Sequence, residues 1–167
     1  LLRERKETDD FSGKKIRQVL DKGGLCPTFL IFQLWIEKME AFKNEPDFEG
    51  LIFDGSPRKI LEAELIDEAM EWYEWSKMVK IFLIDISRQE AFDRLTKRKI
   101  CEKCGKVIPY ISEFKNLTQC PQCGGKLAAR EDDKPLAIEG RLNFFEKEVV
   151  PMIEHYQKQG RLIKING

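Results

Sequence analysis

The chain of 167 residues has no excess of charge of either sign. Lysine and arginine together number 29, and aspartate and glutamate together also number 29, so the formal net charge is zero. Non-specific binding to nucleic acids or to membrane surfaces requires a strongly basic face. We therefore expect neither nucleic acid nor membrane among the partners of this chain.

Long apolar runs, internal repeats and low-complexity segments are also absent. No stretch of eighteen consecutive apolar residues occurs, whereas a membrane-spanning helix needs about twenty. The first residues contain no apolar run of the kind found in signal peptides. His155 is the only histidine, and we interpret it as a surface or packing residue. The length suits one domain with a small insertion.

Cysteine is scarce but informatively placed. Cys101-Glu-Lys-Cys104 and Cys120-Pro-Gln-Cys123 are two C-x-x-C pairs separated by fifteen residues, and each pair is followed by glycine. This spacing is typical of a tetrahedral zinc site. Four thiolates fill every coordination position, so we predict a structural Zn²⁺ without a catalytic water. Two disulfides, or four unrelated thiols, are the alternatives.

Cys26 is the one cysteine outside this arrangement. We interpret it as a small apolar wall residue, because no histidine or second cysteine accompanies it in the sequence. Cysteines held as thiols or metal ligands are typical of a reducing compartment. We therefore expect a cytoplasmic protein.

Apolar periodicity predicts helices that alternate with strands. Short apolar runs bounded by turn residues predict strands at 50–53, 79–86 and 162–165. Helical periodicity covers much of the rest, and a Ser87–Glu90 capping box begins one of the helices. Pro151 is expected to bend the last helix. This order predicts an α/β fold, a three-layer parallel sheet with helices on both faces.

Asp54 follows the strand predicted at 50–53, and ligands of parallel sheets bind beyond the carboxyl ends of the strands. An acidic residue in this position is typical of enzymes that hold the magnesium of a nucleotide, usually through water. A plain Asp-Gly turn is the alternative. Arg58 lies four residues further on, at the start of a predicted helix, where anions are favoured.

Arginines flank both the predicted strand end and the cysteine region. Each one alone would be read as a solvated surface charge, but a metal-braced segment between arginines suggests a lid that closes over a polyanion. Phosphoryl transfer requires charge neutralisation, positioning and exclusion of water, which such a lid supplies. The candidates are Arg3, Arg58, Arg94, Arg98, Arg130 and Arg141.

These residues resemble the adenylate kinase family. Residues 54–58, Asp-Gly-Ser-Pro-Arg, followed by Glu62-Ala63, are similar to its D-G-F-P-R-x-x-x-Q-A signature. The family's lid and hinges are matched in order by Arg94-x-x-x-Arg98, the four cysteines, Arg130-Glu-Asp132-Asp133 and Arg141-Leu142. Residues 23–27 and Leu2-Arg3 resemble two further family segments. The resemblance runs from residue 1 to residue 167.

The resemblance implies a P-loop nucleoside monophosphate kinase fold and the reaction ATP + AMP = 2 ADP, with Mg²⁺ on the donor, in a monomer. It implies a core of residues 1–99 and 134–167, with 1–28 as the segment that binds the monophosphate, and a lid of residues 100–133. The residues matched to the AMP site are Arg3, Gly24, Leu25, Cys26, Gly55, Arg58 and Glu62. Those matched to the ATP site are Arg94, Arg98, Val107 and Ile108, and those matched to catalysis are Arg98, Arg130, Arg141 and Asp54.

The sequence departs from the family at three points. It contains no G-x-x-x-x-G-K-[ST] motif, and it starts at Leu1 without methionine in a helix-like segment. We expect the phosphate loop and the first two strands to precede Leu1, so that this chain alone folds marginally and does not turn over, while the full-length parent is the kinase. Ser56 stands in place of phenylalanine, with an effect that we do not predict.

The third departure is Glu62, which stands in place of glutamine. A carboxylate only accepts hydrogen bonds, which suits the N1–H and N2–H donors of guanine, so GMP is an alternative acceptor. A zinc-ribbon module that binds nucleic acid through Lys97, Arg98, Lys99, Lys103 and Lys106 is a rival hypothesis, although it leaves Asp54, Arg58 and Arg141 unexplained. A degenerate kinase kept as a structural partner is a third.

Overall fold

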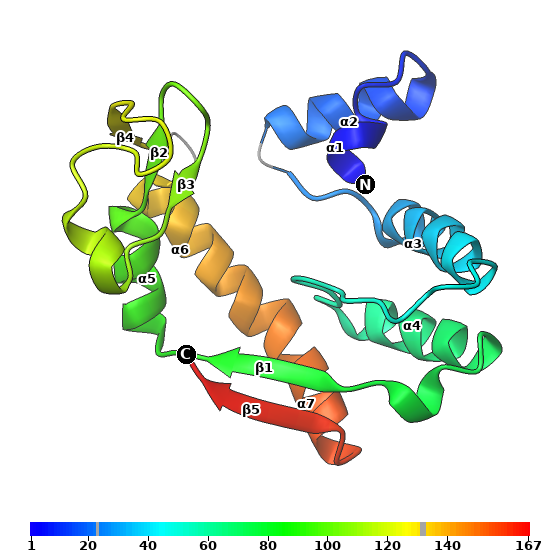
Figure 1. The fold of residues 1–167 in the computed structure, drawn as a ribbon. Helices are drawn as coiled ribbons and strands as arrows, with labels where there is room; N and C mark the ends of the chain where they lie inside the picture. The colour runs from blue at the N-terminus through cyan, green and yellow to red at the C-terminus, as the bar shows by residue number, and fades with distance from the viewer. Residues whose placement is uncertain (23, 131–132) are drawn as a thin grey trace. The chain divides into compact units, whose positions relative to one another are not determined.

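A computed structural model describes residues 1–22, 24–130 and 133–167. Gly23 and the Glu131–Asp132 pair of the lid motif lie outside the described residues. The chain forms two units, Leu1–Lys80 and Ile81–Gly167, which are described separately below (Figure 1). Within the described ranges, no helix is long and apolar enough to cross a membrane.

The first unit is helical. It contains α1 (Leu2–Arg5), α2 (Phe11–Asp21), α3 (Thr28–Lys43), α4 (Ile60–Trp72) and the short 3-10 helix η1 (Ser76–Met78). Asp10 begins α2, because its side chain accepts a hydrogen bond from the backbone N–H of Gly13 at 2.8 Å. The core lies where α3 packs on α4, and it centres on Trp35, Met39, Ile66 and Met70.

The strand predicted at 50–53 is wrong in this structure, since residues 50–53 have no strand structure. The segment still alternates as a strand does: Leu51 and Phe53 pack against the helical core, whereas Ile52 is 91% exposed. The ring of Phe53 meets that of Trp35 edge-on, with centroids 5.5 Å apart. An extended segment becomes a strand only by pairing its backbone with a neighbour, and within this unit no described segment pairs with it.

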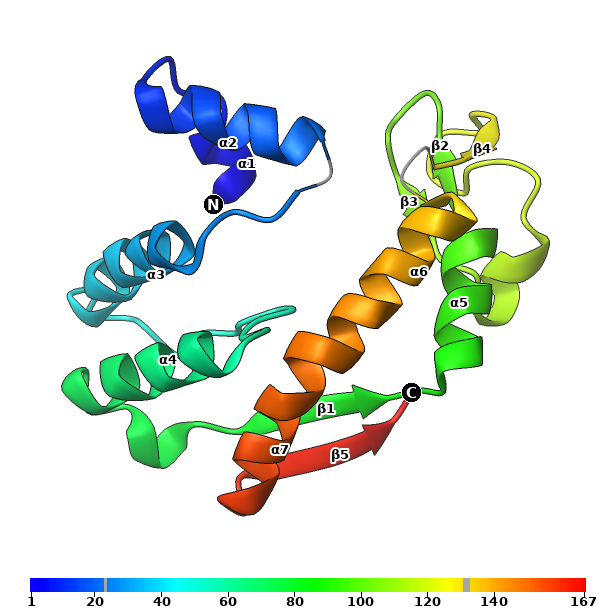
Figure 2. The same cartoon turned by 180° about the vertical axis from the view of Figure 1, so that it is seen from behind.

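The second unit confirms the α/β class and the parallel sheet. β1 (Ile81–Asp85) and β5 (Leu162–Asn166) pair in parallel, with Ile81 opposite Leu162. Figure 2 shows these two strands side by side, with α7 (Val150–Lys158) next to them. Of the predicted sheet, two strands are therefore formed. Among the described residues of this unit, helices do not cover both faces of the pair, because Phe82, Ile84, Ile163 and Ile165 share one face and are exposed.

The long helix before β5 has an irregular middle. α6 (Pro135–Phe144) continues through a π-helical turn, η4 (Phe145–Val149), into α7. Pro151 stands in the first turn of α7; it lacks an N–H, so it cannot continue a regular α-helical ladder, and wider turns are a known accommodation. Ile138 and Leu142 of α6 are buried, whereas Phe145, the first residue of the π-turn, is 43% exposed.

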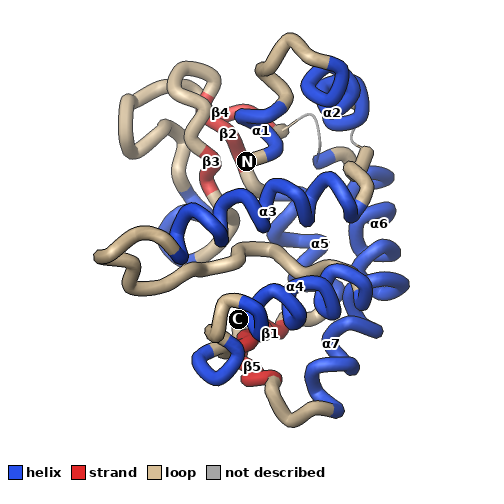
Figure 3. Tube along the Cα trace, turned by 90° about the vertical axis from the view of Figure 1, so that its right-hand side faces the viewer, coloured by secondary structure: helices blue, strands red, loops and turns tan. Residues whose placement is uncertain are grey.

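A small antiparallel sheet forms the region of the predicted lid. Its strands are β2 (Lys99–Cys101), β3 (Val107–Ile108) and β4 (Leu127–Ala129) in the order β3-β2-β4, with the 3-10 helix η2 (Ser112–Asn116) between β3 and β4. α5 (Arg88–Lys97) leads into β2. The predicted cap of α5 is confirmed, because the Ser87 hydroxyl accepts from the Glu90 N–H at 3.1 Å. Figure 3 shows the three strands of this sheet together, with α5 and α6 below them.

Candidate active site and metal centre

The four cysteines of the two C-x-x-C pairs come together as predicted. The sulfur atoms of Cys101, Cys104, Cys120 and Cys123 all lie within 4.8 Å of one another. Cys101 and Cys123 are 3.5 Å apart at sulfur, and Cys104 and Cys120 are 3.6 Å apart. In a tetrahedral thiolate site with Zn–S bonds of 2.3 Å, sulfur atoms lie roughly 3.8 Å apart. All four cysteines are free thiols, so the disulfide alternative is wrong for this structure.

The backbone builds two matching turns behind these sulfurs. Gly105 donates its N–H to the carbonyl of Cys101, and Gly124 donates to that of Cys120, each at 2.9 Å. Both glycines have positive φ, 72° and 67°, a conformation that other residues adopt only with strain. The sequence places both knuckles because glycine follows each pair.

Gly125 shows how tightly the sulfurs are enclosed. A Cβ at this position would lie 2.8 Å from the sulfur of Cys101 and 3.2 Å from that of Cys123. Side chains do not approach one another so closely. Only glycine therefore lets the second knuckle close on the first, and the four donors fit a bound tetrahedral metal ion.

The thiols in this cluster ionise unequally. A backbone hydrogen bond from Cys104, helped by one from Lys103, lowers the pKa of Cys101 to about 6 despite burial. For Cys123, a hydrogen bond from Gly125 favours the thiolate, but the neighbouring sulfurs, led by Cys104, and burial raise the pKa to about 12. Four thiolates this close repel one another, so full ionisation of the cluster requires a cation among them.

Three of the predicted arginines converge on one carboxylate, that of Asp133. Arg98 donates from Nε to Oδ2 at 2.5 Å and from Nη2 to Oδ1 at 2.7 Å, and Arg141 donates from Nη1 to Oδ1 at 3.2 Å. Arg130 lies close enough for its charge to act on the same carboxylate. Asp133 in turn donates its backbone N–H to the Arg130 carbonyl at 3.0 Å. In this structure the anion beside these arginines is a protein carboxylate, and their binding of a phosphate stays a prediction.

The electrostatics of Asp133 follow from this surrounding. Its side chain is 2% exposed, and burial alone would raise the pKa of the carboxyl. Burial is the largest single effect, but the hydrogen bonds and charge of Arg98, the charge of Arg130 and the hydrogen bond from Arg141 together outweigh it and lower the pKa below its usual value. Asp133 was not among the candidate site residues. Its position three residues after Arg130 is the signal that could have marked it.

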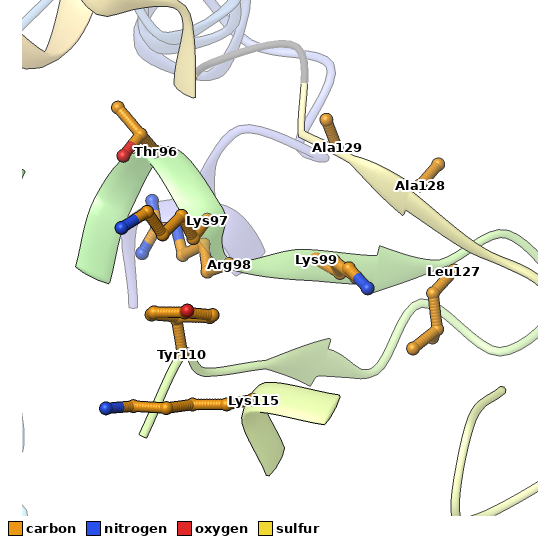
Figure 4. A pocket seen from close by; sticks show the side chains of 9 residues that line it. All are labelled: Thr96, Lys97, Arg98, Lys99, Tyr110, Lys115, Leu127, Ala128 and Ala129. Atoms are coloured by element: carbon orange, nitrogen blue, oxygen red, sulfur yellow. The ribbon is translucent and has the colours of Figure 1, made fainter. Parts of the chain in front are cut away.

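A cavity of about 360 Å³ lies beside Arg98, on α5 and the small sheet. Lys97 and Lys115 lie on opposite sides of the Tyr110 ring, as Figure 4 shows, with their ammonium nitrogens 5.1 and 5.3 Å from its centroid. Lys99 also lines the cavity and donates to the Leu117 carbonyl at 3.1 Å. The charged side chains that line this cavity are all cationic, so it suits an anionic ligand.

The remaining candidates for the ATP site, Arg94, Val107 and Ile108, are not part of the arginine cluster around Asp133. Arg94 pairs with Glu90 of its own helix, Nε to Oε1 at 2.6 Å. On β3, Val107 is 42% exposed, whereas Ile108 is buried. Of these two neighbours, only Val107 has an accessible side chain, and their contact with ATP stays a prediction.

In the first unit, the signature around Asp54 forms a tight turn. Gly55, at φ 67°, makes the turn, and its carbonyl accepts from Arg58 Nε at 2.6 Å. Glu62 is buried, and its Oε2 accepts from the Arg58 backbone N–H at 2.8 Å. Glu62 therefore orders the start of α4 with one oxygen and keeps the other as an acceptor. Asp54 is exposed.

A second cavity, of about 190 Å³, lies in the first unit. Asp54 and Ser56 line it, together with Leu1, Lys38 and the apolar side chains of Trp35 and Met39. It has the mixed apolar and polar lining that is typical of small-molecule sites. The motif that ends at Arg58 thus borders a hollow of its own unit.

The other candidates for the AMP site lie in α1 and in the segment before α3. Arg3 is exposed on α1, and Leu25 is 56% exposed. Gly24 donates its N–H to the Val19 carbonyl at 2.9 Å, in the turn that follows α2. Cys26 is half-buried, and burial raises the pKa of its thiol, which agrees with an unreactive wall residue. The positions of these residues relative to the arginines of the second unit stay a prediction.

Three features are together typical of an α/β protein that binds phosphate groups. They are the small antiparallel sheet, the arginines around Asp133 and the Asp-Gly-x-Pro-Arg turn. A model of the adenylate kinase family matches residues 1–161. A relative named adenylate kinase from Methanocella arvoryzae is 34% identical over the whole of this chain and 76% of its own length. Those from Archaeoglobus fulgidus and Thermotoga neapolitana are 32% and 33% identical, over 93% and 98% of this chain and 70% and 72% of theirs.

The chain belongs to the adenylate kinase family. It is therefore an enzyme of the nucleoside monophosphate kinase class. The family model extends far beyond the cysteine region and covers both features that the rival zinc-ribbon hypothesis left unexplained, the Asp54–Arg58 turn and Arg141.

Proposed function

We propose that this protein transfers the terminal phosphate of ATP to AMP and so forms two molecules of ADP. The observation that carries the proposal is the convergence of Arg98, Arg130 and Arg141 on Asp133. Guanidinium groups that hold a carboxylate have the geometry and charge to hold a phosphate, which forms the same forked hydrogen bonds. The relatives that match this chain carry the name adenylate kinase, which supports AMP as the acceptor.

In this proposal the residues divide between the two nucleotides. Arg3, Arg58 and Gly55 bind the AMP phosphate region, and the backbone of residues 24–26 runs along AMP. Arg94 stacks on the ATP base, Val107 and Ile108 contact ATP, and the cationic cavity beside Arg98 accepts part of the donor. Asp54 orders the water molecules of the Mg²⁺ that accompanies ATP. The lid spans residues 100–133 on a core of 1–99 and 134–167, with 1–28 as the monophosphate segment.

The chemistry then needs little covalent participation by the protein. An oxygen of the AMP phosphate attacks the terminal phosphorus of ATP, and the bond from that phosphorus to the bridging oxygen of the leaving ADP breaks. Arg98, Arg130 and Arg141 neutralise the charge on the transferred group, and closure of the lid excludes water. In the absence of nucleotide, Asp133 keeps the guanidinium groups of Arg98 and Arg141 paired.

The metal of the lid is proposed to be Zn²⁺ in a structural role. Cys101, Cys104, Cys120 and Cys123 would hold it, and when bound it contributes folding free energy to the lid. The donor chemistry supports zinc, because four thiolates in this geometry prefer it to Mg²⁺ or Ca²⁺. We further propose a monomer in the cytoplasm that binds neither nucleic acid nor membrane.

GMP remains a second candidate acceptor because of Glu62. Its carboxylate already accepts from Arg58 through Oε2, and the other oxygen can only accept. Guanine presents two donors on its Watson–Crick edge, whereas adenine presents one. A glutamate in this position therefore fits guanine at least as well.

The test is phosphate transfer from ATP to AMP, GMP, CMP and UMP, measured on this chain and on the longest polypeptide that its gene encodes. We expect AMP to be preferred, and an Arg141→Ala variant to lose activity at least about a hundredfold. A preference for GMP would overturn the acceptor assignment. Full activity in Arg141→Ala would overturn the role of the arginines. The expectation that this chain alone does not turn over stays a prediction, which the same assay checks. Binding of an RNA oligomer would contradict the proposed absence of nucleic acid.

A further inference from the structure

Arg88, the first residue of α5, is bound by three acceptors on another helix. Its Nη1 donates to Glu146 Oε1 at 2.6 Å, and its Nη2 donates to Glu139 Oε2 at 2.6 Å and to Asn143 Oδ1 at 3.0 Å. Glu139 and Asn143 belong to α6, and Glu146 belongs to the π-turn that follows. One guanidinium thus joins the start of α5 to two turns of the helix beside it.

Local preferences do not explain this arginine. The N-terminus of a helix carries partial positive charge, which disfavours a cation in its first turn. By contrast, the three acceptors are spaced four and three residues apart, so they form a row on one face of α6 and η4. An arginine presents its donors from several nitrogen atoms in a planar fork, so it can reach acceptors that are spread over two helical turns, whereas a lysine donates from a single nitrogen. The contact between helices, rather than the helix itself, accounts for Arg88.

α5 and α6 are in contact, and Figures 1 and 2 show them closest beside the small sheet. Side chains join the two helices at two points. One tie is Arg88; the other is Asp133, which is shared by Arg98 at the end of α5 and Arg141 on α6. Arg88 and Arg98 are ten residues apart in the sequence, or about 15 Å along a helix. Arg141 stands between Glu139 and Asn143, the two α6 residues that Arg88 grips.

This placement gives the Arg88 tie a specific effect. Gripping residues on either side of Arg141 fixes the rotation of α6 about its own axis. That rotation decides where the guanidinium of Arg141 points. The second tie is the weaker one on the α6 side, because Arg141 is 43% exposed and holds Asp133 through a 3.2 Å hydrogen bond. The buried side chains of Ile138 and Leu142 hold the same helix by packing, and the Arg88 tie adds a polar restraint to it.

We propose that Arg88 is a positioning residue for phosphate binding: it sets the rotation of α6 so that Arg141 meets the same anion as Arg98. The proposal rests on the proposed function, which makes Arg98 and Arg141 phosphate ligands. Arg88 itself touches no ligand. It acts through Arg141, and this distinguishes it from a residue that only stabilises the fold.

The experiment is a double-mutant cycle read out as affinity for inorganic tripolyphosphate, which probes the arginines without a base. Calorimetry compares the parent with Arg88→Ala, Arg141→Ala and the double variant, all in the full chain. Arg88→Lys and Glu139→Gln weaken the tie from either side, and they serve if Arg88→Ala does not fold. Lys147→Ala, an exposed cation in the same π-turn, is the matched control.

We expect Arg88→Ala to weaken tripolyphosphate binding about tenfold in the parent and less than about twofold in the Arg141→Ala background, because contacting groups couple. Lys147→Ala leaves the affinity unchanged. Equal losses in both backgrounds, or no loss in the parent, would overturn the positioning role while leaving the arginine site intact. If Arg141→Ala does not weaken binding, or the parent does not bind at all, the proposed phosphate site fails first and this proposal with it.

A second readout needs no ligand. Hydrogen exchange of the backbone amides of residues 139–146 reports how firmly α6 and η4 are held. We expect faster exchange there in Arg88→Ala and in Glu139→Gln, and unchanged exchange in Lys147→Ala. Unchanged exchange in the first two variants would show that the tie does not restrain α6, and would also overturn the proposal.

Discussion

Asp133→Asn is expected to destabilise the protein by about 3 kcal/mol. The carboxylate is 2% exposed and receives two hydrogen bonds from Arg98 and one from Arg141. A buried hydrogen bond to a charged group contributes roughly 1.5–3 kcal/mol. Asparagine keeps one oxygen that can accept from Arg98, but it turns the other position into a donor that faces a guanidinium.

Arg98 contributes most of this loss of stability. Its side chain is 21% exposed, so the loss of one charge-assisted bond counts nearly in full. Arg141 is 43% exposed, so solvent screens its contact, and we assign it at most about 0.5 kcal/mol. The contributions of Arg98 and Arg141 add to about 3 kcal/mol, because the guanidinium of Arg98 is left partly unpaired. This value is the lower end of the roughly 3–5 kcal/mol that breaking a buried ion pair costs.

The assay is urea denaturation of the parent and the variant from pH 2 to pH 8. The folded state lowers the pKa of Asp133, so its contribution is complete above the unfolded value of about 3.9 and disappears as the pH falls through the lower folded value. The difference in unfolding free energy between parent and variant should be constant from pH 5 to pH 8 and should become smaller below pH 4. Asp93→Asn is the control, because the Asp93 carboxylate is exposed and its contacts with Lys97 and Gln89 are both long, at 3.4 Å. A difference below about 0.5 kcal/mol at pH 7, or one that does not narrow as the pH falls below 4, would refute the reasoning.

Three further predictions concern the same unit. Gly125→Ala should abolish tight binding of Zn²⁺, measured by competition with a chromophoric chelator, because the new Cβ would lie 2.8 Å from the Cys101 sulfur. Gly140→Ala is the control: its new Cβ meets nothing within 4 Å in α6, so it should raise the unfolding free energy by about 0.5–1 kcal/mol. Equal Zn²⁺ affinity of the two variants would contradict the enclosed site. Ser87→Ala should lower stability by about 1 kcal/mol in urea denaturation through loss of the α5 cap, whereas Ser76→Ala, whose residue makes no such cap, should change little. A strong chelator should speed hydrogen exchange in residues 101–127 but not in β1 and β5. Unchanged exchange in residues 101–127 would contradict a structural metal in this region.

The sequence predicted those parts of the site that depend on short spacings. The C-x-x-C pairs with their glycines predicted a four-sulfur cluster, and the structure confirms the cluster. The Ser87 cap was confirmed for the same reason, since it involves groups three residues apart. Short-range geometry is fixed by the backbone, and residue types at set intervals reveal it.

Features that depend on contacts between residues far apart in the sequence were predicted less well. Residues 50–53 have the pattern of a strand, but a strand needs a neighbour, and pattern alone does not supply one. The π-turn at Phe145–Val149 could not be inferred from Pro151 alone, because several adjustments can accommodate a proline. Asp133 was missed as a site residue because its role arises from arginines 35 and 8 residues away in the sequence.

The central claim is that Arg98, Arg130 and Arg141 bind one polyphosphate together. The most direct measurement is a titration of the protein with Mg²⁺-ATP, followed through the arginine Nε–Hε signals in nitrogen-15 NMR spectra, with assignments from Arg→Lys variants. The account predicts that the signals of all three arginines shift along one binding curve as Asp133 gives way to phosphate. Signals that stay in place at saturating ATP, or shift for one arginine alone, would contradict it.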